Sequence, residues 1–286
     1  MLRNLLALLL GVTCLSVQAQ NTHLWKVTDP QSKHVSYLFG TYHLFGNTFV
    51  DSFPAIRSAL EASIVVVTET SMDLVEQRRL YHARPSSPML AESLSPADRD
   101  LLQAIINRRR NVDLSRLTPG ELLVRLQAYY PLVKCPVISK RDTIFMDEYL
   151  QHLGRQAGKR MVYLETDSFQ LVRVGQLTKH VDWPLFRKAA PAWLALYRKE
   201  GLEAVRCEMS ERYAGFADEY KLDDDCRKQE ALLIRDRNAD WMTRLPALLR
   251  DAPTFVAVGR GHLERRCGLV AELRRLGFTV EPVPLR

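Results

Sequence analysis

Two copies of one short pattern, an apolar strand followed by Gly-x-x-His, lie near opposite ends of this chain and constrain its fold more than any other feature. The first copy is Gly40–His43, after the apolar run 35–39, and the second is Gly259–His262, after the run 255–258. In open α/β sheets, ligands bind at the carboxyl ends of the strands. The repeated pattern therefore predicts one shared site that receives a histidine from each end of the chain.

Two further apolar runs each end in a Glu-Thr pair, at Glu69-Thr70 and at Glu165-Thr166. Alternating or continuous apolar residues between turn residues are typical of strands. The first two predicted strands are separated by the turn 29–32, which indicates an antiparallel hairpin. In all, the sequence predicts six strands, at 23–27, 35–39, 64–67, 161–164, 254–258 and 278–282.

The segments between these strands have helical patterns. Thr118-Pro119-Gly120-Glu121 forms a capping box that begins one of the helices. A long helix over 226–250 is expected to carry Arg237, Asn238 and Trp241. The predicted helical segments are 52–62, 95–109, a stretch from 118, 143–157, 184–250 with breaks near Gly215 and Asp223–Asp225, and 266–276. We expect an α/β fold in which two α/β halves form a mixed central sheet, with a cleft at the strand carboxyl ends and a helical insertion between the halves.

The amino terminus has the features of a secretory signal peptide. Arg3 precedes the apolar run Leu5–Leu10, and Val17-Gln18-Ala19 supplies small residues before a cleavage point. We therefore predict a signal peptide over residues 1–19 and one domain over 20–286. No other stretch is long and apolar enough for a membrane span, so we expect no stable membrane insertion after cleavage and a periplasmic or secreted protein.

The composition is that of an ordinary globular protein, with 47% hydrophobic and 26% charged residues. The formal net charge is +7, and loss of Arg3 with the signal peptide lowers it by one. The basic pairs and triplets, such as Arg108–Arg110, are scattered and have no interleaved aromatic residues. This pattern favours solvated helix faces and disfavours nucleic acid as a partner.

Four cysteines remain after signal cleavage, an even number that indicates two disulfides in an oxidising compartment. Cys207 and Cys226 flank a polar segment between helices, so we expect that pair, which leaves Cys135 with Cys267. No Cys-x-x-Cys spacing occurs, so a structural zinc site is not expected.

The four polar residues at the strand ends, His43, Glu69, Glu165 and His262, combine two imidazoles with two carboxylates. Such a set suits a divalent metal ion that acidifies water and polarises a carbonyl, with a glutamate as general base. The same groups could also act without a metal, with a histidine as base and a glutamate that orients it. The pattern leaves both possibilities open.

At these residues the chain resembles the TraB/GumN family over nearly all of the mature sequence. The most specific block is Phe255–Leu263. The segments that carry the resemblance are Leu38–Leu44, Val65–Glu69, Gly158–Thr166 with Gln170, Arg237-Asn238, Thr254–Leu263 and Gly277–Val280.

The family includes the Tiki metalloproteases, which have two Gly-x-x-His motifs and a required glutamate and use manganese or cobalt. The resemblance implies that His43 and His262 are metal ligands, that Glu69 is a ligand or the base, and that Glu165 is a second carboxylate. It also implies that Arg237 and Asn238 face the cleft. The wider fold group is similar to erythromycin esterases and to ChaN-type haem-binding proteins.

One position departs from the family pattern: Arg260 replaces the usual small residue between the last two glycines. The leading hypothesis is an exported hydrolase that uses Mn, Co or Zn, most simply a peptidase with a peptide or protein substrate. The alternatives are a non-catalytic protein that binds haem, a metal or a peptide, and a metal-free esterase that uses the His/Glu pairs.

Overall fold

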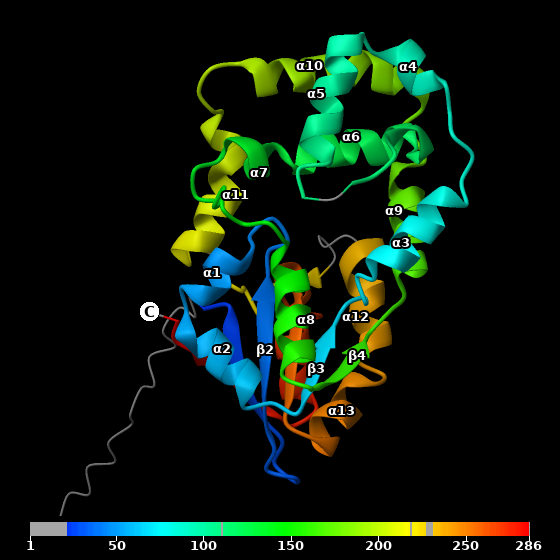
Figure 1. Ribbon diagram of the computed structural model, residues 1–286. Helices are drawn as coiled ribbons and strands as arrows, with labels where there is room; N and C mark the ends of the chain where they lie inside the picture. The colour runs from blue at the N-terminus through cyan, green and yellow to red at the C-terminus, as the bar shows by residue number, and fades with distance from the viewer. Residues whose placement is uncertain (1–21, 110, 218, 227–230, 286) are drawn as a thin grey trace, which may run out of the picture.

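A computed structural model describes residues 22–285 except 110, 218 and 227–230, so the predicted signal peptide lies outside the described residues. Its centre is one mixed sheet of six strands in the order β4-β3-β5-β2-β1-β6 (Figure 1). The strands are β1 Leu24–Thr28, β2 Val35–Thr41, β3 Val65–Thr68, β4 Arg160–Tyr163, β5 Thr254–Gly259 and β6 Thr279–Val283.

The four strands β4, β3, β5 and β2 are parallel neighbours, so their carboxyl ends lie at the same edge of the sheet. β1 forms the predicted antiparallel hairpin with β2 and also pairs with β6. Thr41 of β2 lies opposite Gly259 of β5. The two Gly-x-x-His motifs therefore begin side by side, although more than 200 residues separate them in the sequence.

The strand order confirms the predicted α/β fold with a mixed central sheet and a helical insertion. β5, from the end of the chain, lies between β2 and β3, so the two halves share one sheet. The helices are α1 Asn47–Asp51, α2 Pro54–Glu61, α3 Leu74–His82, α4 Met89–Ser93, α5 Pro96–Ile106, α6 Pro119–Ala128, α7 Tyr130–Lys134, α8 Met146–Gln156, α9 Asp167–Thr178, α10 Trp183–Arg198, α11 Ala204–Gly215, α12 Asp236–Trp241, α13 Leu245–Asp251 and α14 Leu269–Arg275.

Side chains of a strand alternate between the two faces of the sheet, and helices cover both faces. Phe39 and Phe255 point to the face that α1, α2 and α8 cover. Leu38 and Val256 point to the opposite face, where α12, α13 and α14 pack. The sheet therefore has two apolar cores and forms a rigid support for the residues at its carboxyl edge.

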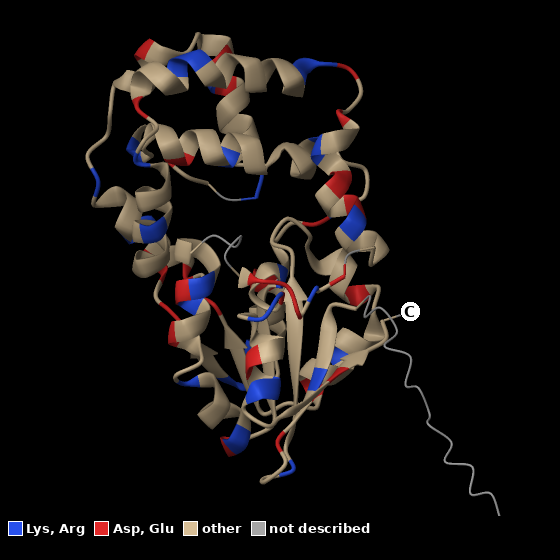
Figure 2. Cartoon of the chain, turned by 180° about the vertical axis from the view of Figure 1, so that it is seen from behind, with Lys and Arg blue, Asp and Glu red and all other residues tan. Residues whose placement is uncertain are grey.

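The helical insertion has its own core, which includes the fully buried Leu102, Leu122 and Phe186. Figure 1 shows α4, α5, α6, α7 and α10 as a layer separated from the sheet, with α3, α9 and α11 connecting the two parts. The predicted capping box is present at the start of α6, where Thr118 and Glu121 satisfy each other's backbone N–H groups. In Figure 2, acidic and basic residues occur together along the helices of both parts. None of the helices in the described residues combines the length and hydrophobicity that a membrane span needs.

The predicted long helix over 226–250 is wrong in its continuity. A π-helical turn at Ala231–Arg235 leads into α12, and α12 and α13 are separate helices. Pro246 lies in the first turn of α13, where its missing N–H has no intrahelical partner to lose. Residues 227–230 lie outside the described part of the chain. The break leaves Arg237 and Asn238 on a short helix beside the sheet edge.

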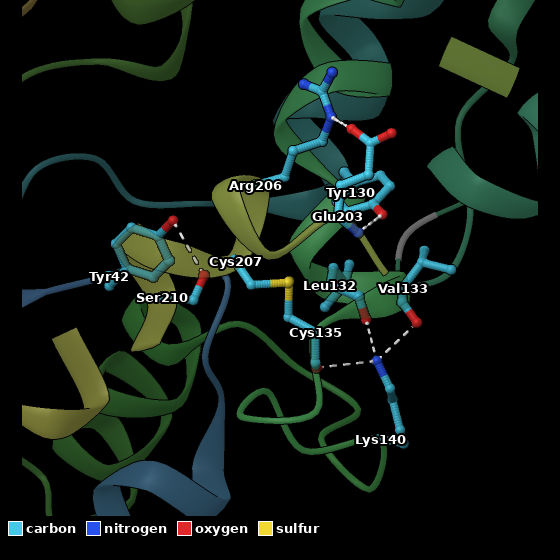
Figure 3. Close-up of a disulfide and its surroundings, with 10 residues drawn as sticks. All are labelled: Tyr42, Tyr130, Leu132, Val133, Cys135, Lys140, Glu203, Arg206, Cys207 and Ser210. Carbon is cyan, nitrogen blue, oxygen red and sulfur yellow. Dashed lines mark hydrogen bonds and ion pairs between the residues drawn. A yellow bond between two sulfur atoms is a disulfide. The ribbon is translucent and has the colours of Figure 1, made fainter. Parts of the chain in front are cut away.

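The predicted cysteine pairing is also wrong. The structure joins Cys135 to Cys207 and Cys226 to Cys267, with Cα–Cα distances of 5.6 and 5.9 Å. Cys135 ends α7, and Cys207 faces it from the packed helix α11 (Figure 3). Cys226 lies beside Cys267 because the backbone of Arg266 donates a hydrogen bond to Asp224 in the preceding segment. Tertiary contacts between distant segments, which sequence spacing does not reveal, decide both pairs.

We expect the double substitution Cys135→Ala/Cys207→Ala to lower the free energy of unfolding by about 2–5 kcal/mol, because the bridge restricts the unfolded chain. Urea denaturation of the variant and the wild type measures this difference. A peptide map of the non-reduced protein should recover the peptide that joins Cys135 to Cys207. Recovery of a peptide that joins Cys207 to Cys226 would contradict the pairing.

Candidate functional site

A cleft of about 860 Å³ opens where β2, β3 and β5 end. Its lining includes four of the residues that the sequence singled out: His43, Glu69, Arg237 and His262. Helices α9 and α11 of the insertion form the opposite wall and contribute Val174, Val205 and Met209. Figure 3 shows how the Cys135–Cys207 bridge holds α11, with Tyr42, the neighbour of His43, pointing toward Ser210 of that helix.

His43 is the most accessible of the four, with 60% of its side chain exposed. Its Nδ1 lies 2.6 Å from Oδ2 of Asp147, and the other oxygen of Asp147 accepts a hydrogen bond from Thr41. The carboxylate of Asp147 raises the pKa of His43 to about 9, against the opposing effect of desolvation. Because Nδ1 is bound to Asp147, Nε2 is the ring atom left for a ligand.

Asp147 is a site residue that the sequence analysis missed. It lies in the first turn of α8 and is buried, although no motif distinguishes it from an ordinary helix-starting acid. The only sequence signal was its place in a first turn, where acidic residues are common. Its pairing with His43 depends on α8 packing against the sheet, which is a tertiary contact.

We expect Asp147→Asn to lower the pKa of His43 from about 9 toward its usual value of 6.5, because the substitution removes the negative charge beside Nδ1. NMR titration of the His43 ring in metal-free protein measures this change. Asp73→Asn, at the exposed start of α3, is the control and should leave the titration unaltered. An unchanged pKa in Asp147→Asn would show that Asp147 does not control this ring.

His262 is buried, with its side chain 3% exposed. Asn238 donates its amide protons to the carbonyls of His262 and Cys267, so its Oδ1 is the atom that accepts from Nδ1 of His262 at 2.7 Å. Burial lowers the pKa of His262 to about 3, which leaves the ring neutral at physiological pH. Its Nε2 therefore carries a lone pair and is directed toward Glu69 and Arg237.

Glu69 connects the two histidines. Its Oε1 accepts the backbone N–H of Gly259 at 2.7 Å and lies 3.7 Å from Nε2 of His262. Burial opposes its ionisation, but the electrostatic effects of His262, Arg237 and His43 and the Gly259 hydrogen bond lower its pKa to about 2. Since the His262 ring is neutral, the guanidinium of Arg237 is the buried cation that keeps Glu69 ionised.

Arg237 joins the two glutamates into one buried cluster. Its Nη2 pairs with Glu69 and with Glu165, and its Nε donates to Glu165 at 3.0 Å. Its Nη1 lies 3.1 Å from Nε2 of His262. Burial raises the pKa of Glu165, and this residue does not line the cleft. The structure thus places Glu165 and Asn238 behind the cleft lining, where they hold Arg237 and His262.

The space beside Gly259 tests whether a metal ion fits these residues. A methyl group at position 259 would lie 3.3 Å from Oε1 of Glu69, 3.5 Å from Nε2 of His43 and 3.6 Å from Cδ2 of His262. Donor atoms of two predicted ligands, His43 and Glu69, therefore face one small space, and the His262 ring borders it through carbon Cδ2. Imidazole nitrogen and carboxylate oxygen suit Mn, Co and Zn, and both rings have the Nδ1 partner that is typical of metal-binding histidines.

The arrangement is not a closed metal site. Within the described residues, no three His, Cys, Asp or Glu side chains converge as a metal-binding group. For His262 to bind a cation through Nε2, Arg237 has to give up its contact with that atom. The donor set fits the group by its chemistry, and a shift of the Arg237 side chain is the adjustment that it requires.

Arg260, the departure from the family pattern, lines the cleft but is held at its side. Its guanidinium pairs with Glu264 and lies 4.8 Å from the centre of the Tyr220 ring. These contacts hold the Arg260 guanidinium against Glu264 and Tyr220 at the wall of the cleft.

Comparison with known proteins supports the resemblance that the motifs indicate. The sequence matches the TraB/PrgY/gumN family over residues 23–282, nearly the whole chain. The protein belongs to the TraB/PrgY/gumN family. Searches of curated proteins and of solved structures find no match. The family match spans β1 to β5 and all but the last residue of β6, and it includes His43, Glu69, Glu165, Arg237, Asn238 and His262.

Proposed function

We propose that this protein is an exported hydrolase, periplasmic or secreted, that cleaves amide bonds of peptides with a divalent metal ion. The observation that carries the proposal is the space beside Gly259, which Nε2 of His43 and Oε1 of Glu69 both approach. Membership in the TraB/PrgY/gumN family supports the same proposal. The two disulfides are compatible with an oxidising compartment outside the cytoplasm.

In this proposal, His43, His262 and Glu69 hold the metal, and their neighbours prepare them for it. Asp147 and Asn238 accept the Nδ1 protons, so Nε2 of each ring is the atom that would hold the ion, which at His43 would take the place of a proton. When bound, the divalent ion would supply Lewis acidity, which polarises a carbonyl and lowers the pKa of water. A pKa near 2 suits Glu69 better as an ionised ligand than as a proton acceptor while Arg237 contacts it.

In this proposal Arg237 also stabilises negative charge that develops during the reaction. It lines the cleft as a buried cation, and negative charge develops on the carbonyl oxygen of an amide as it is attacked. Glu165 retains the guanidinium at the cleft wall through its Nε and Nη2 groups when Nη1 leaves His262. A preorganised cation stabilises such charge without the cost of reorganising solvent.

The test is a metal-dependent assay on the purified mature protein. We expect cleavage of a peptide library with added Mn, Co or Zn and none with a chelator, and we expect His43→Ala and His262→Ala each to lose metal binding. His152→Ala, on the outer part of α8, is the matched control and should retain it. Stoichiometric metal in both site variants would overturn the ligand assignment. A Soret band on haem addition without any hydrolysis would instead favour a binding protein.

A metal-free esterase is the second candidate, and the contact of Arg237 with Nε2 of His262 favours it. In that reaction His43 would be the proton donor, because Asp147 raises its pKa to about 9 and keeps the ring protonated at neutral pH. Ester cleavage that persists in a chelator and disappears in His43→Ala would support this candidate over the first.

A further inference from the structure

A second, smaller cavity of about 220 Å³ adjoins the main cleft. The two cavities share His43, Glu69 and Gln170, so the candidate site lies at their junction. A substrate that reaches His43 and Glu69 from the main cleft therefore has a second space beyond them. We call this space the small pocket; it lies between the sheet edge and helices α3, α6 and α8 of the described chain.

The charges of the small pocket leave one cation without a carboxylate partner. Asp147 pairs with His43, and Glu69 pairs with Arg237. Arg125, from α6, donates to the hydroxyl of Tyr81 at 2.6 Å and forms no ion pair with the described residues. The charge of Glu121 acts on Arg125 through space, but both Glu121 oxygens accept hydrogen bonds from Arg84.

The walls of the two cavities also differ in chemistry. Tyr81, Tyr129 and Phe145 give the small pocket an aromatic wall beside the Arg125 guanidinium. The main cleft has aliphatic side chains beside Tyr42 and Tyr213, and two of the apolar ones are largely exposed, Val205 at 74% and Met209 at 65%. An arginine in a partly desolvated aromatic pocket is a typical partner of a carboxylate.

We propose that the small pocket binds a carboxylate of the substrate through Arg125, while the apolar part of the substrate lies in the main cleft; this inference rests on the proposed hydrolase function. The volume near 220 Å³ is below that of pockets for drug-sized ligands, so only a short segment fits beyond the reacting bond. The carboxylate has two sources, the carboxyl terminus of a peptide or an acidic side chain close to the cleaved bond.

Three peptides that share one apolar sequence up to the last residue distinguish the two sources of the carboxylate. The first ends in a free carboxylate, the second in a carboxamide, and the third in a carboxamide with glutamate as the last residue. With manganese present, we expect the kcat/KM of the wild type to be at least about 10-fold higher for the first peptide than for the second, because its KM is lower. Recovery with the third peptide supports a side-chain carboxylate, and its failure supports the terminal one. Equal cleavage of all three would overturn the inference and leave the proposed function intact.

Arg125→Gln tests the residue itself. We expect the ratio of kcat/KM for the carboxylate and carboxamide peptides to fall toward unity in this variant, whereas Arg125→Lys should retain part of the preference. Arg187→Gln removes the same charge from an exposed position of α10 and is the matched control. Far-UV circular dichroism and thermal melting verify folding. A preference that survives in folded Arg125→Gln would overturn the assignment.

A binding measurement separates this inference from the hydrolase proposal. Calorimetry with N-acetyl-dileucine and with its carboxamide requires no turnover. If the wild type cleaves no peptide, tighter binding of the acid that Arg125→Gln abolishes would still support the carboxylate pocket. Equal binding of acid and amide would overturn it.

Discussion

Glu69→Gln is expected to reduce kcat/KM for peptide cleavage by at least about 10²-fold, because either a lost metal ligand or a lost proton acceptor has an effect of this size. Glutamine keeps the shape of the side chain but removes the negative charge that Arg237 neutralises and that faces His262. Steady-state kinetics with saturating manganese measures the loss.

Metal analysis of the same variant separates the two roles of Glu69. Loss of bound metal together with activity would identify Glu69 as a ligand, whereas full metal content with low kcat would identify it as the proton acceptor. Glu61→Gln, at the exposed end of α2, is the control and should change neither quantity. Wild-type kcat/KM in Glu69→Gln would remove Glu69 from the site.

Arg237→Met is expected to lower the free energy of unfolding by about 3–5 kcal/mol, the largest stability change among the predictions, because it leaves two buried carboxylates without their cation. The side chains of Glu69 and Glu165 are 8% and 3% exposed, so water cannot replace the guanidinium. Urea denaturation of the metal-free protein measures the difference.

The control for this prediction is Arg275→Met on α14. Arg275 forms an exposed ion pair with Glu272, and such surface pairs contribute about 0–1 kcal/mol. A loss in Arg237→Met no larger than in the control would show that the buried cluster does not depend on Arg237. A triple variant that also carries Glu69→Gln and Glu165→Gln should recover part of the stability, since no buried charge then lacks a partner.

The sequence alone determined the sheet and the edge that bears the site. Apolar strands that end in Gly-x-x-His or in Glu-Thr have a local pattern, and parallel strands bring their carboxyl ends together whatever lies between them. For this reason His43, Glu69 and His262, from three distant segments, could be assigned to one place before the structure was known.

Only the tertiary structure decided which groups orient and neutralise these residues. Asp147 reaches His43 because α8 packs on the sheet, and Arg237 lies between Glu69 and Glu165 because the first turn of α12 lies beside the ends of β3 and β4. The cysteine pairs depend in the same way on helices and segments that meet after folding. Contacts between distant elements leave no periodic trace in the chain, so spacing and composition cannot specify them, whereas strand pattern and strand direction can.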